Sequence, residues 1–232
     1  MRYKLLLIGT LLLLCSFTEY RVAVENEAVL AVSDSICNSQ MGLRERTGKN
    51  DGVHITKYMN YTHLSGNKGY PYCAAGQAWC LGTACDMLGI KFPFTKKSAV
   101  ANFYFDDAKK HGVECNGMIG KHKFVIWKAQ SGNTGHIERV HSVIDAKTAT
   151  VMMYAFNTSN GLSGSQNNGN GNYLRKRTLK SFLGRLRLRG LVSMYEPKIV
   201  KLIDKDYYEH VQKIAGQHFA ASPNMDYSWL GC

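Results

Sequence analysis

The pattern of apolar and polar positions changes its period along the chain. In residues 74–88 the apolar positions recur at steps of three and four, which predicts one face of an α-helix. Gly89 follows where such a helix would end, and a second short helix is predicted over residues 98–110. Three later segments are rich in β-branched and aromatic residues and are separated by turn residues, so they predict successive antiparallel strands: 123–128, 136–144 and 150–157.

The N-terminal side of this region carries weaker signals. Residues 16–34 are expected to form a loosely specified lead-in. A short helix is predicted from Ser35, because Ser35 can cap its start and Gly48 stands where it would stop. A further segment near 54–64 and a loop that contains Gly and Pro then lead to Cys73.

The C-terminal side is rich in polar and basic residues. The Gly- and Asn-rich stretch 157–172 predicts a loop. The mixed basic and apolar residues 173–195 are enough for one more strand or two. From about Glu196 the chain is expected to form a tail, 196–232, with a helix over 204–217.

Helices followed by a run of antiparallel strands predict an α+β fold, with N-terminal helices packed on a central antiparallel β-sheet. The small residues of the helix over 74–88 would let it lie close to the strands. The chain has 232 residues and no internal repeat, which indicates one domain, expected at 36–195.

The first residues are typical of a secretory signal. Residues 1–4 carry two positive charges and residues 5–14 are almost wholly apolar. This run is shorter than the roughly 20 apolar residues of a membrane-spanning helix. We therefore expect a cleaved signal peptide over 1–20, an exported chain in the periplasm or outside the cell, and no stable membrane span in the mature chain. A lipid anchor on Cys15 is the alternative, which the preceding Leu14 disfavours.

The chain is basic, with 29 Lys and Arg against 17 Asp and Glu and a net charge of +12. Such a balance suits an anionic partner or polymer. A nucleic acid is the least favoured partner, because the basic residues of 173–189 alternate with apolar ones as in strands and no nucleic-acid motif accompanies them.

Three cysteines lie close together in the sequence, Cys73, Cys80 and Cys85. Their gaps do not fit zinc ligands, which pair at separations of about two to four residues, so no metal site is expected. Cys73 and Cys80 would lie roughly 10 Å apart on one helix, whereas a disulfide needs Cα atoms within about 7 Å. We expect Cys80 and Cys85 to be buried packing residues. The pairing of the six cysteines beyond the signal stays open.

Cys73 differs because it begins the predicted helix, where the macrodipole and free N–H groups stabilise a thiolate. A nucleophile needs a base and a group that orients the base. His136 starts a predicted strand with Glu138 on the same face, and Asn157 ends the next strand. A cysteine at a helix start, then a histidine and an amide on strands, is the layout of papain-like cysteine hydrolases.

Several motifs resemble the CHAP family of cysteine, histidine-dependent amidohydrolases and peptidases, closest to the exported and phage-associated branch that acts on bacterial cell walls. They occur in order from residue 39 to 179: SQMGLRERTGKNDG, GYPYCAAGQAWC, FVIWKAQSGNTGHIERV, FNTSNG and GNYLRKRTL. The resemblance implies a papain-like fold without a cofactor, with Cys73 as nucleophile, His136 as general base and Asn157 as the orienting group.

Two positions depart from the pattern of the family. Many relatives carry a glutamate where this chain has Ala155, and a small residue where it has Glu138. Glu138 could raise the pKa of His136, replace the orienting group or contact substrate.

The leading hypothesis is an exported peptidoglycan amidase or endopeptidase. The two departures keep open a catalytically inactive module on the same fold that binds the cell wall or a partner. A papain-like protease that acts on protein is the third possibility.

Overall fold

The computed structural model describes residues 26–66, 68–111, 115–116, 118–160, 165–179 and 182–195. The expected signal peptide with Cys15, and the expected tail at 196–232 with its helix, lie outside these residues. Within the described residues, no helix is both long enough and apolar enough to cross a membrane.

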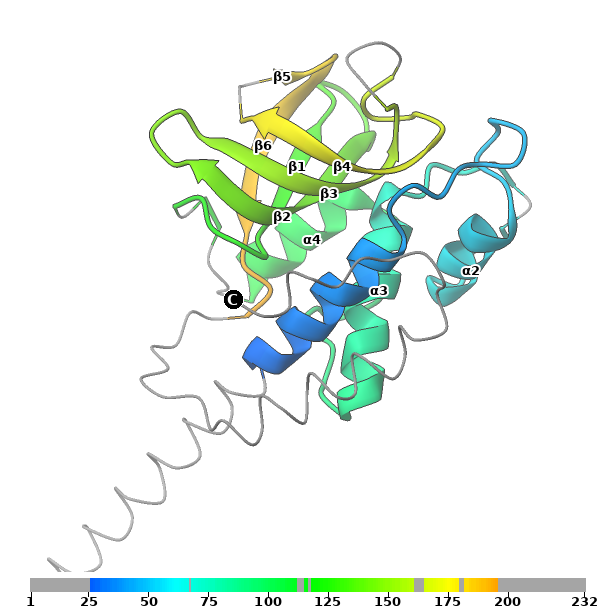
Figure 1. Cartoon of the computed structure of the whole chain (residues 1–232), viewed down its shortest axis with the longest axis horizontal. Coiled ribbons are helices and arrows are strands. Elements are labelled where there is room, and N and C mark those ends of the chain that lie inside the picture. The colour runs from blue at the N-terminus through cyan, green and yellow to red at the C-terminus, as the bar shows by residue number, and fades with distance from the viewer. Residues whose placement is uncertain are drawn as a thin grey trace, which may run out of the picture.

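The centre of the fold is one curled sheet of six antiparallel strands in the order β4-β3-β2-β1-β6-β5 (Figure 1). The three predicted strands are confirmed as β1 (Phe124–Lys128), β2 (Gly135–Asp145) and β3 (Thr150–Thr158). The basic stretch forms three further strands rather than one or two: β4 (Gly171–Thr178), the two-residue β5 (Phe182–Leu183) and β6 (Leu186–Val192).

The helices lie together on one side of the sheet (Figure 1). The predicted central helix is α3 (Cys73–Leu88), and Gly89 ends it with a left-handed φ of 64°. Helix α4 (Ala101–Lys110) begins three residues later than predicted, and α2 (Val53–Tyr61) fills the segment before the Gly and Pro loop. Helix α3 packs on β2 and β3, while α4 packs on β1, β2 and β6. The α+β prediction is therefore confirmed.

The predicted helix from Ser35 is wrong. The helix instead covers residues 26–39, so Ser35 lies inside it rather than at its cap. The cause is an apolar face in the supposed lead-in: Val29, Val32 and Ile36 recur at steps of three and four and are buried in the main core. The helix thus begins before residue 36, where the domain was expected to start.

Apolar residues form a core on each side of the sheet. The larger core joins the helices to β1, β2 and β3 and contains both Cys80 and Cys85, which are buried as expected. The smaller core lies on the other side, around Val125, Trp127 and Val140. Directly opposed residues in antiparallel strands point to the same side of a sheet. Side chains that share a face of the sheet with Trp127 therefore point toward the side that holds the smaller core.

Candidate active site

Cys73 is the first residue of α3, as the sequence predicted. Tyr72 precedes it as the N-cap without a capping side-chain hydrogen bond, and the first turn of α3 holds no acidic residue. The backbone N–H of Cys73 is among those that a helix start leaves without an intrahelical partner. The side chain is 3% exposed. The thiol is thus placed where backbone donors and the helix dipole favour negative charge.

His136 is the second residue of β2, directly opposite Trp127 of β1. Its ring centroid lies 6.1 Å from that of Trp127, and its side chain is fully buried. The preceding Gly135 allows this approach, since a Cβ there would lie 2.8 Å from the Trp127 carbonyl oxygen. A side-chain amide also braces the turn before β2, because Asn102 Nδ2 donates to Asn133 O at 3.1 Å. This close packing fixes the position of His136 at the start of β2.

Glu138 holds one end of the imidazole. Its Oε1 lies 3.2 Å from His136 Nε2, and both side chains are fully buried. The other ring nitrogen, Nδ1, is buried without a hydrogen-bond partner among the described residues. Burial alone lowers the pKa of His136, but the nearby Cys73 thiol, followed by Glu138, raises it to about 9. Because Glu138 occupies Nε2, Nδ1 is the ring nitrogen left to exchange a proton with Cys73.

Arg177 of β4 completes this group. Its Nη2 donates to Glu138 Oε1 at 2.7 Å and its Nε donates to Oε2 at 3.1 Å, which makes a two-pronged ion pair. Burial raises the pKa of Glu138, but His136 and Arg177 together lower it below its ordinary value. Gln166 in turn holds the guanidinium, because Arg177 Nη1 donates to Gln166 Oε1 at 2.8 Å. The buried carboxylate thus keeps its charge between two cations.

Asn157 was expected to orient His136, but its side chain forms hydrogen bonds with the backbone of two other segments. It lies at the end of β3 in a left-handed conformation with φ 56°, and its side chain is fully buried. With both ends of the amide satisfied, Nδ2 donates to Gly169 O at 2.9 Å and Oδ1 accepts from the Tyr72 N–H at 3.2 Å. Its amide therefore fastens the backbone just before Cys73 to the loop after β3, and the carboxylate of Glu138 is the group at the imidazole.

The structure thus brings together Cys73, His136 and Glu138, and adds Arg177, which the sequence analysis missed. The available signal was the two-residue period of a strand over 173–178, which places Arg175 and Arg177 on one face. The partner strand could not be inferred from that pattern.

Four of the described cysteines are free thiols: Cys37, Cys73, Cys80 and Cys85. In the part of the chain that the structure describes, no group of three or more His, Cys, Asp or Glu side chains is placed to hold a metal ion. No family model, curated protein or solved structure matches this chain.

Proposed function

We propose that this protein is a thiol-dependent amide hydrolase with Cys73 as nucleophile and His136 as acid and base. The observation that carries the proposal is the interaction of the helix-start thiol with an imidazole whose far nitrogen lies 3.2 Å from a buried carboxylate. A nucleophile, a base and an orienting group in that order are what acyl transfer to a thiol requires. In this proposal Glu138 takes the place expected for Asn157, and Arg177 positions Glu138.

The reaction would proceed through a thioester. The thiol proton first passes to His136, which gives a thiolate–imidazolium pair, and Cys73 Sγ then attacks the carbonyl carbon of the amide. The backbone N–H of Cys73 stabilises the oxyanion. When the C–N bond breaks, His136 returns the proton to the leaving amine. A water molecule then gives a proton to His136 and attacks the thioester, which releases the carboxylic acid and the free thiol. Glu138 holds the imidazolium charge that forms in each half.

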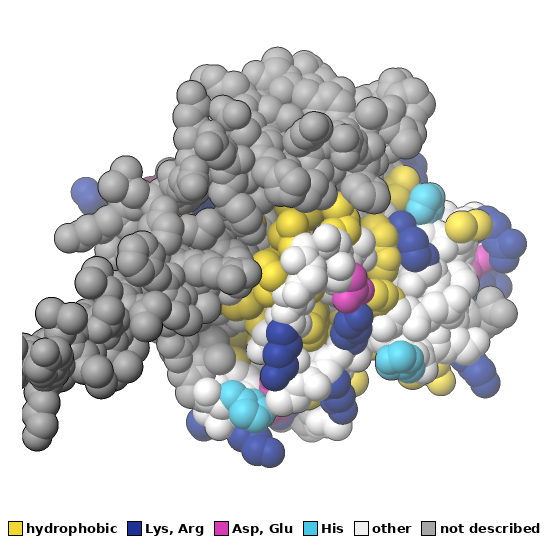
Figure 2. Space-filling view, turned by 90° about the horizontal axis from the view of Figure 1, so that it is seen from below, with side chains coloured by type: hydrophobic (Ala, Val, Ile, Leu, Met, Phe, Trp, Pro, Cys, Tyr) yellow, Lys and Arg dark blue, Asp and Glu magenta, His cyan; other side chains and the backbone are white. Residues whose placement is uncertain are grey.

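Peptidoglycan is the substrate that we propose, on the strength of the CHAP-like motifs, the signal-like N-terminus and the charge. A net charge of +12 favours contact with an anionic wall polymer. Figure 2 shows one face of the molecule, on which Lys and Arg side chains are more frequent than Asp and Glu. The papain-like character of the fold belongs to the same proposal, supported by a cysteine-bearing helix packed on an antiparallel sheet that carries the histidine.

Hydrolysis of purified sacculi tests this function. The wild type should release soluble fragments with new amino groups, and Cys73→Ala should reduce the rate to that of buffer, since the thioester cannot form. Cys85→Ala, the same change on the same helix, is the matched control and should retain activity. Equal rates for wild type and Cys73→Ala would remove Cys73 from the mechanism.

Two parallel measurements separate the alternatives. A protein substrate digested while sacculi stay intact would identify a protease. Alkylation of the thiols at neutral pH, followed by mass analysis of peptides, reports the reactivity of Cys73. A Cys73 no more reactive than Cys80, which is fully buried, together with bound but intact sacculi, would identify a binding module.

A further inference from the structure

Two buried thiols outside the candidate active site lie close together between neighbouring helices. Cys37 lies near the end of the helix over 26–39, and Cys80 lies in the middle of α3. Both side chains are 0% exposed and belong to the larger core, on the helix side of the sheet (Figure 1). The structure describes both as thiols. The mechanism proposed above uses neither of them.

Three observations place the two sulfurs beside each other. Cys37 Sγ donates to Gln77 Oε1 at 3.9 Å, and Gln77 lies three residues before Cys80, on the same face of α3. Burial raises the pKa of the Cys80 thiol, and the nearby Cys37 thiol raises it further. Burial also raises the pKa of Tyr58, to which Cys80 and Cys37 both contribute. The Cys37 thiol therefore lies against the face of α3 that carries Cys80, with Tyr58 near both.

We propose that Cys37 and Cys80 form a disulfide when the chain folds in an oxidising compartment. The signal-like N-terminus supports export to such a compartment, where paired cysteines are oxidised. The other cysteines of α3 are placed differently. Cys73 lies about two turns before Cys80, and Cys85 Sγ lies 3.5 Å from the hydroxyl oxygen of Tyr195. The proposal does not depend on the hydrolase function, and it leaves the thiol of Cys73 free.

The oxidant is a disulfide reagent, for which oxidised glutathione serves as the probe. One protein thiol loses its proton, attacks a sulfur of the reagent and expels a thiolate that is then protonated, which leaves a mixed disulfide. The second protein thiol loses its proton, attacks the protein sulfur of that bond and expels the second thiolate, which is protonated in turn. Two protein thiols are thus oxidised to one disulfide, while the reagent is reduced to two thiols. Because burial disfavours the thiolate of Cys80, the exchange takes place before the core closes.

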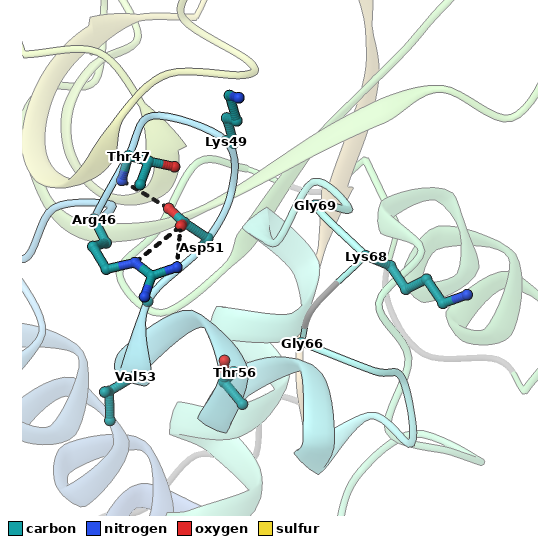
Figure 3. A pocket seen from close by; sticks show the side chains of 10 residues that line it. Arg46, Thr47, Lys49, Asp51, Val53, Thr56, Gly66, Lys68 and Gly69 are labelled. Atoms are coloured by element: carbon teal, nitrogen blue, oxygen red, sulfur yellow. Dashed lines mark hydrogen bonds and ion pairs between the residues drawn. The ribbon is translucent and has the colours of Figure 1, made fainter.

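The cross-link joins two helices and encloses residues 38–79. This segment includes an exposed turn with short-range contacts, in which Arg46 Nη2 donates to Asp51 Oδ2 at 3.1 Å and the Thr47 N–H donates to Asp51 Oδ1 at 2.8 Å (Figure 3). Contacts between residues so close in sequence do not bring the two ends of the segment together in the unfolded chain. A disulfide that closes a loop of roughly 40 residues does restrict the unfolded chain, and it thereby stabilises the fold.

Peptide mapping of the full-length chain tests the pairing. The reduced chain is refolded with oxidised and reduced glutathione, its remaining thiols are blocked by alkylation, and it is digested with trypsin and chymotrypsin. Chymotrypsin cuts after Tyr72, Trp79 and Leu81, and so separates the three cysteines of α3. We expect a peptide that contains Cys37 joined to one that contains Cys80, with two hydrogen atoms fewer than the two reduced peptides together.

Stability gives a second readout. The oxidised wild type should unfold at a guanidinium concentration about 0.5 M higher than the same protein after reduction. This difference should vanish in Cys37→Ala, whereas Cys85→Ala, the same change at another buried cysteine of the larger core, should keep it. The mapping on the wild type decides the matter even where a variant fails to fold. Cys37 joined to a cysteine other than Cys80, or both recovered as alkylated thiols after oxidative refolding, would overturn the proposal.

Discussion

Glu138 is the residue on which the candidate site depends most. It faces His136 on one side and Arg177 on the other, and all three share one side of the sheet. Across the strands it stands directly opposite Ala155, whose side chain is also fully buried. Ala155 is the position at which the proposed resemblance to the CHAP family would place a glutamate. The small alanine leaves room for the carboxylate of Glu138, so a neighbouring strand supplies the group that β3 lacks.

This pairing gives a rescue experiment. Glu138→Ala should lower kcat at least about 100-fold, because the imidazole loses the charge that holds it. Directly opposed residues have Cβ atoms about 5 Å apart, so a glutamate at position 155 can reach the same space. Ala155→Glu in the Glu138→Ala background should therefore restore part of kcat, measured with sacculi. Ala155→Gln in that background has the same size without the charge, and restoration by Gln as large as by Glu would contradict this role of the carboxylate.

The titration of His136 reports its contact with Cys73. The pKa of His136 is raised from an ordinary 6.5 to about 9 in the folded protein, against the opposing effect of burial. A raised folded-state pKa means that protonation stabilises the fold; this contribution is complete below about pH 6.5 and is lost as pH rises through about 9. Cys73→Ala should lower the pKa of His136 in an NMR titration and flatten the loss of stability over that pH interval. An unchanged pKa would show that Cys73 does not act on the imidazole.

The approach of α3 to β3 determines where the thiol lies relative to the strands. At Gly76, three residues and just under one turn beyond Cys73, an added Cβ would lie 2.3 Å from a ring carbon of Phe156. Nearby, Gln77 Nε2 donates to Tyr154 O at 2.8 Å, which ties the helix to the backbone of the same strand. Gly76 thus permits the close approach of α3 to β3, and the buried Gln77 amide fixes the position of the helix along that strand. Moving α3 away from β3 would also carry Cys73 away from its place beside His136.

Gly76→Ala is expected to destabilise the protein by about 1–3 kcal/mol, the usual cost of overpacking a core. Because the ring of Phe156 is the obstacle, Phe156→Leu should relieve part of that cost, and the double variant should lose less stability than the two single variants added together. Guanidinium unfolding measures both effects. Gly120→Ala is the control, since its nearest neighbour would lie at 3.6 Å. A Gly76→Ala protein as stable as the Gly120→Ala protein would contradict the tight contact.

Over the whole chain, the elements that could be predicted from the sequence are those with a clear hydrophobic period within the segment itself. The strands at 123–128, 136–144 and 150–157 and the helix after Cys73 have clear periods, so their type and approximate bounds could be inferred. The helix over 26–39 was missed because its apolar face follows the signal-like segment, where a lead-in was expected. The partnership of Glu138 with Arg177 depends on the order of β2, β3 and β4, which no local pattern contains.

Strand β2 connects distant parts of the molecule through two successive charged side chains. Glu138 points to one side, toward Arg177 of β4, while Arg139 points to the helix side. There Arg139 Nη2 lies 2.7 Å from Asp34 Oδ1 in the helix over 26–39, and it donates to Leu30 O at 3.0 Å. Arg139 is fully buried and Asp34 nearly so. A single strand therefore carries the candidate site on one face and the attachment of the first described helix on the other.

Removing only Asp34 from its ion pair with Arg139 should lower the free energy of unfolding far more than replacing both residues with apolar ones. Asp34→Ala leaves the buried charge of Arg139 without its carboxylate, so the free energy of unfolding should fall by about 3–5 kcal/mol. Asp34→Leu with Arg139→Met removes both charges and fills the space with apolar atoms, and should lie much closer to the wild type. Asp106→Ala is the control, because it breaks an exposed pair with Arg189 and should cost at most about 1 kcal/mol. Guanidinium unfolding at neutral pH ranks the four proteins. If Asp34→Ala were no less stable than Asp106→Ala, apolar packing would be what holds the helix over 26–39 on the sheet, and the ion pair with Arg139 of β2 would not be required.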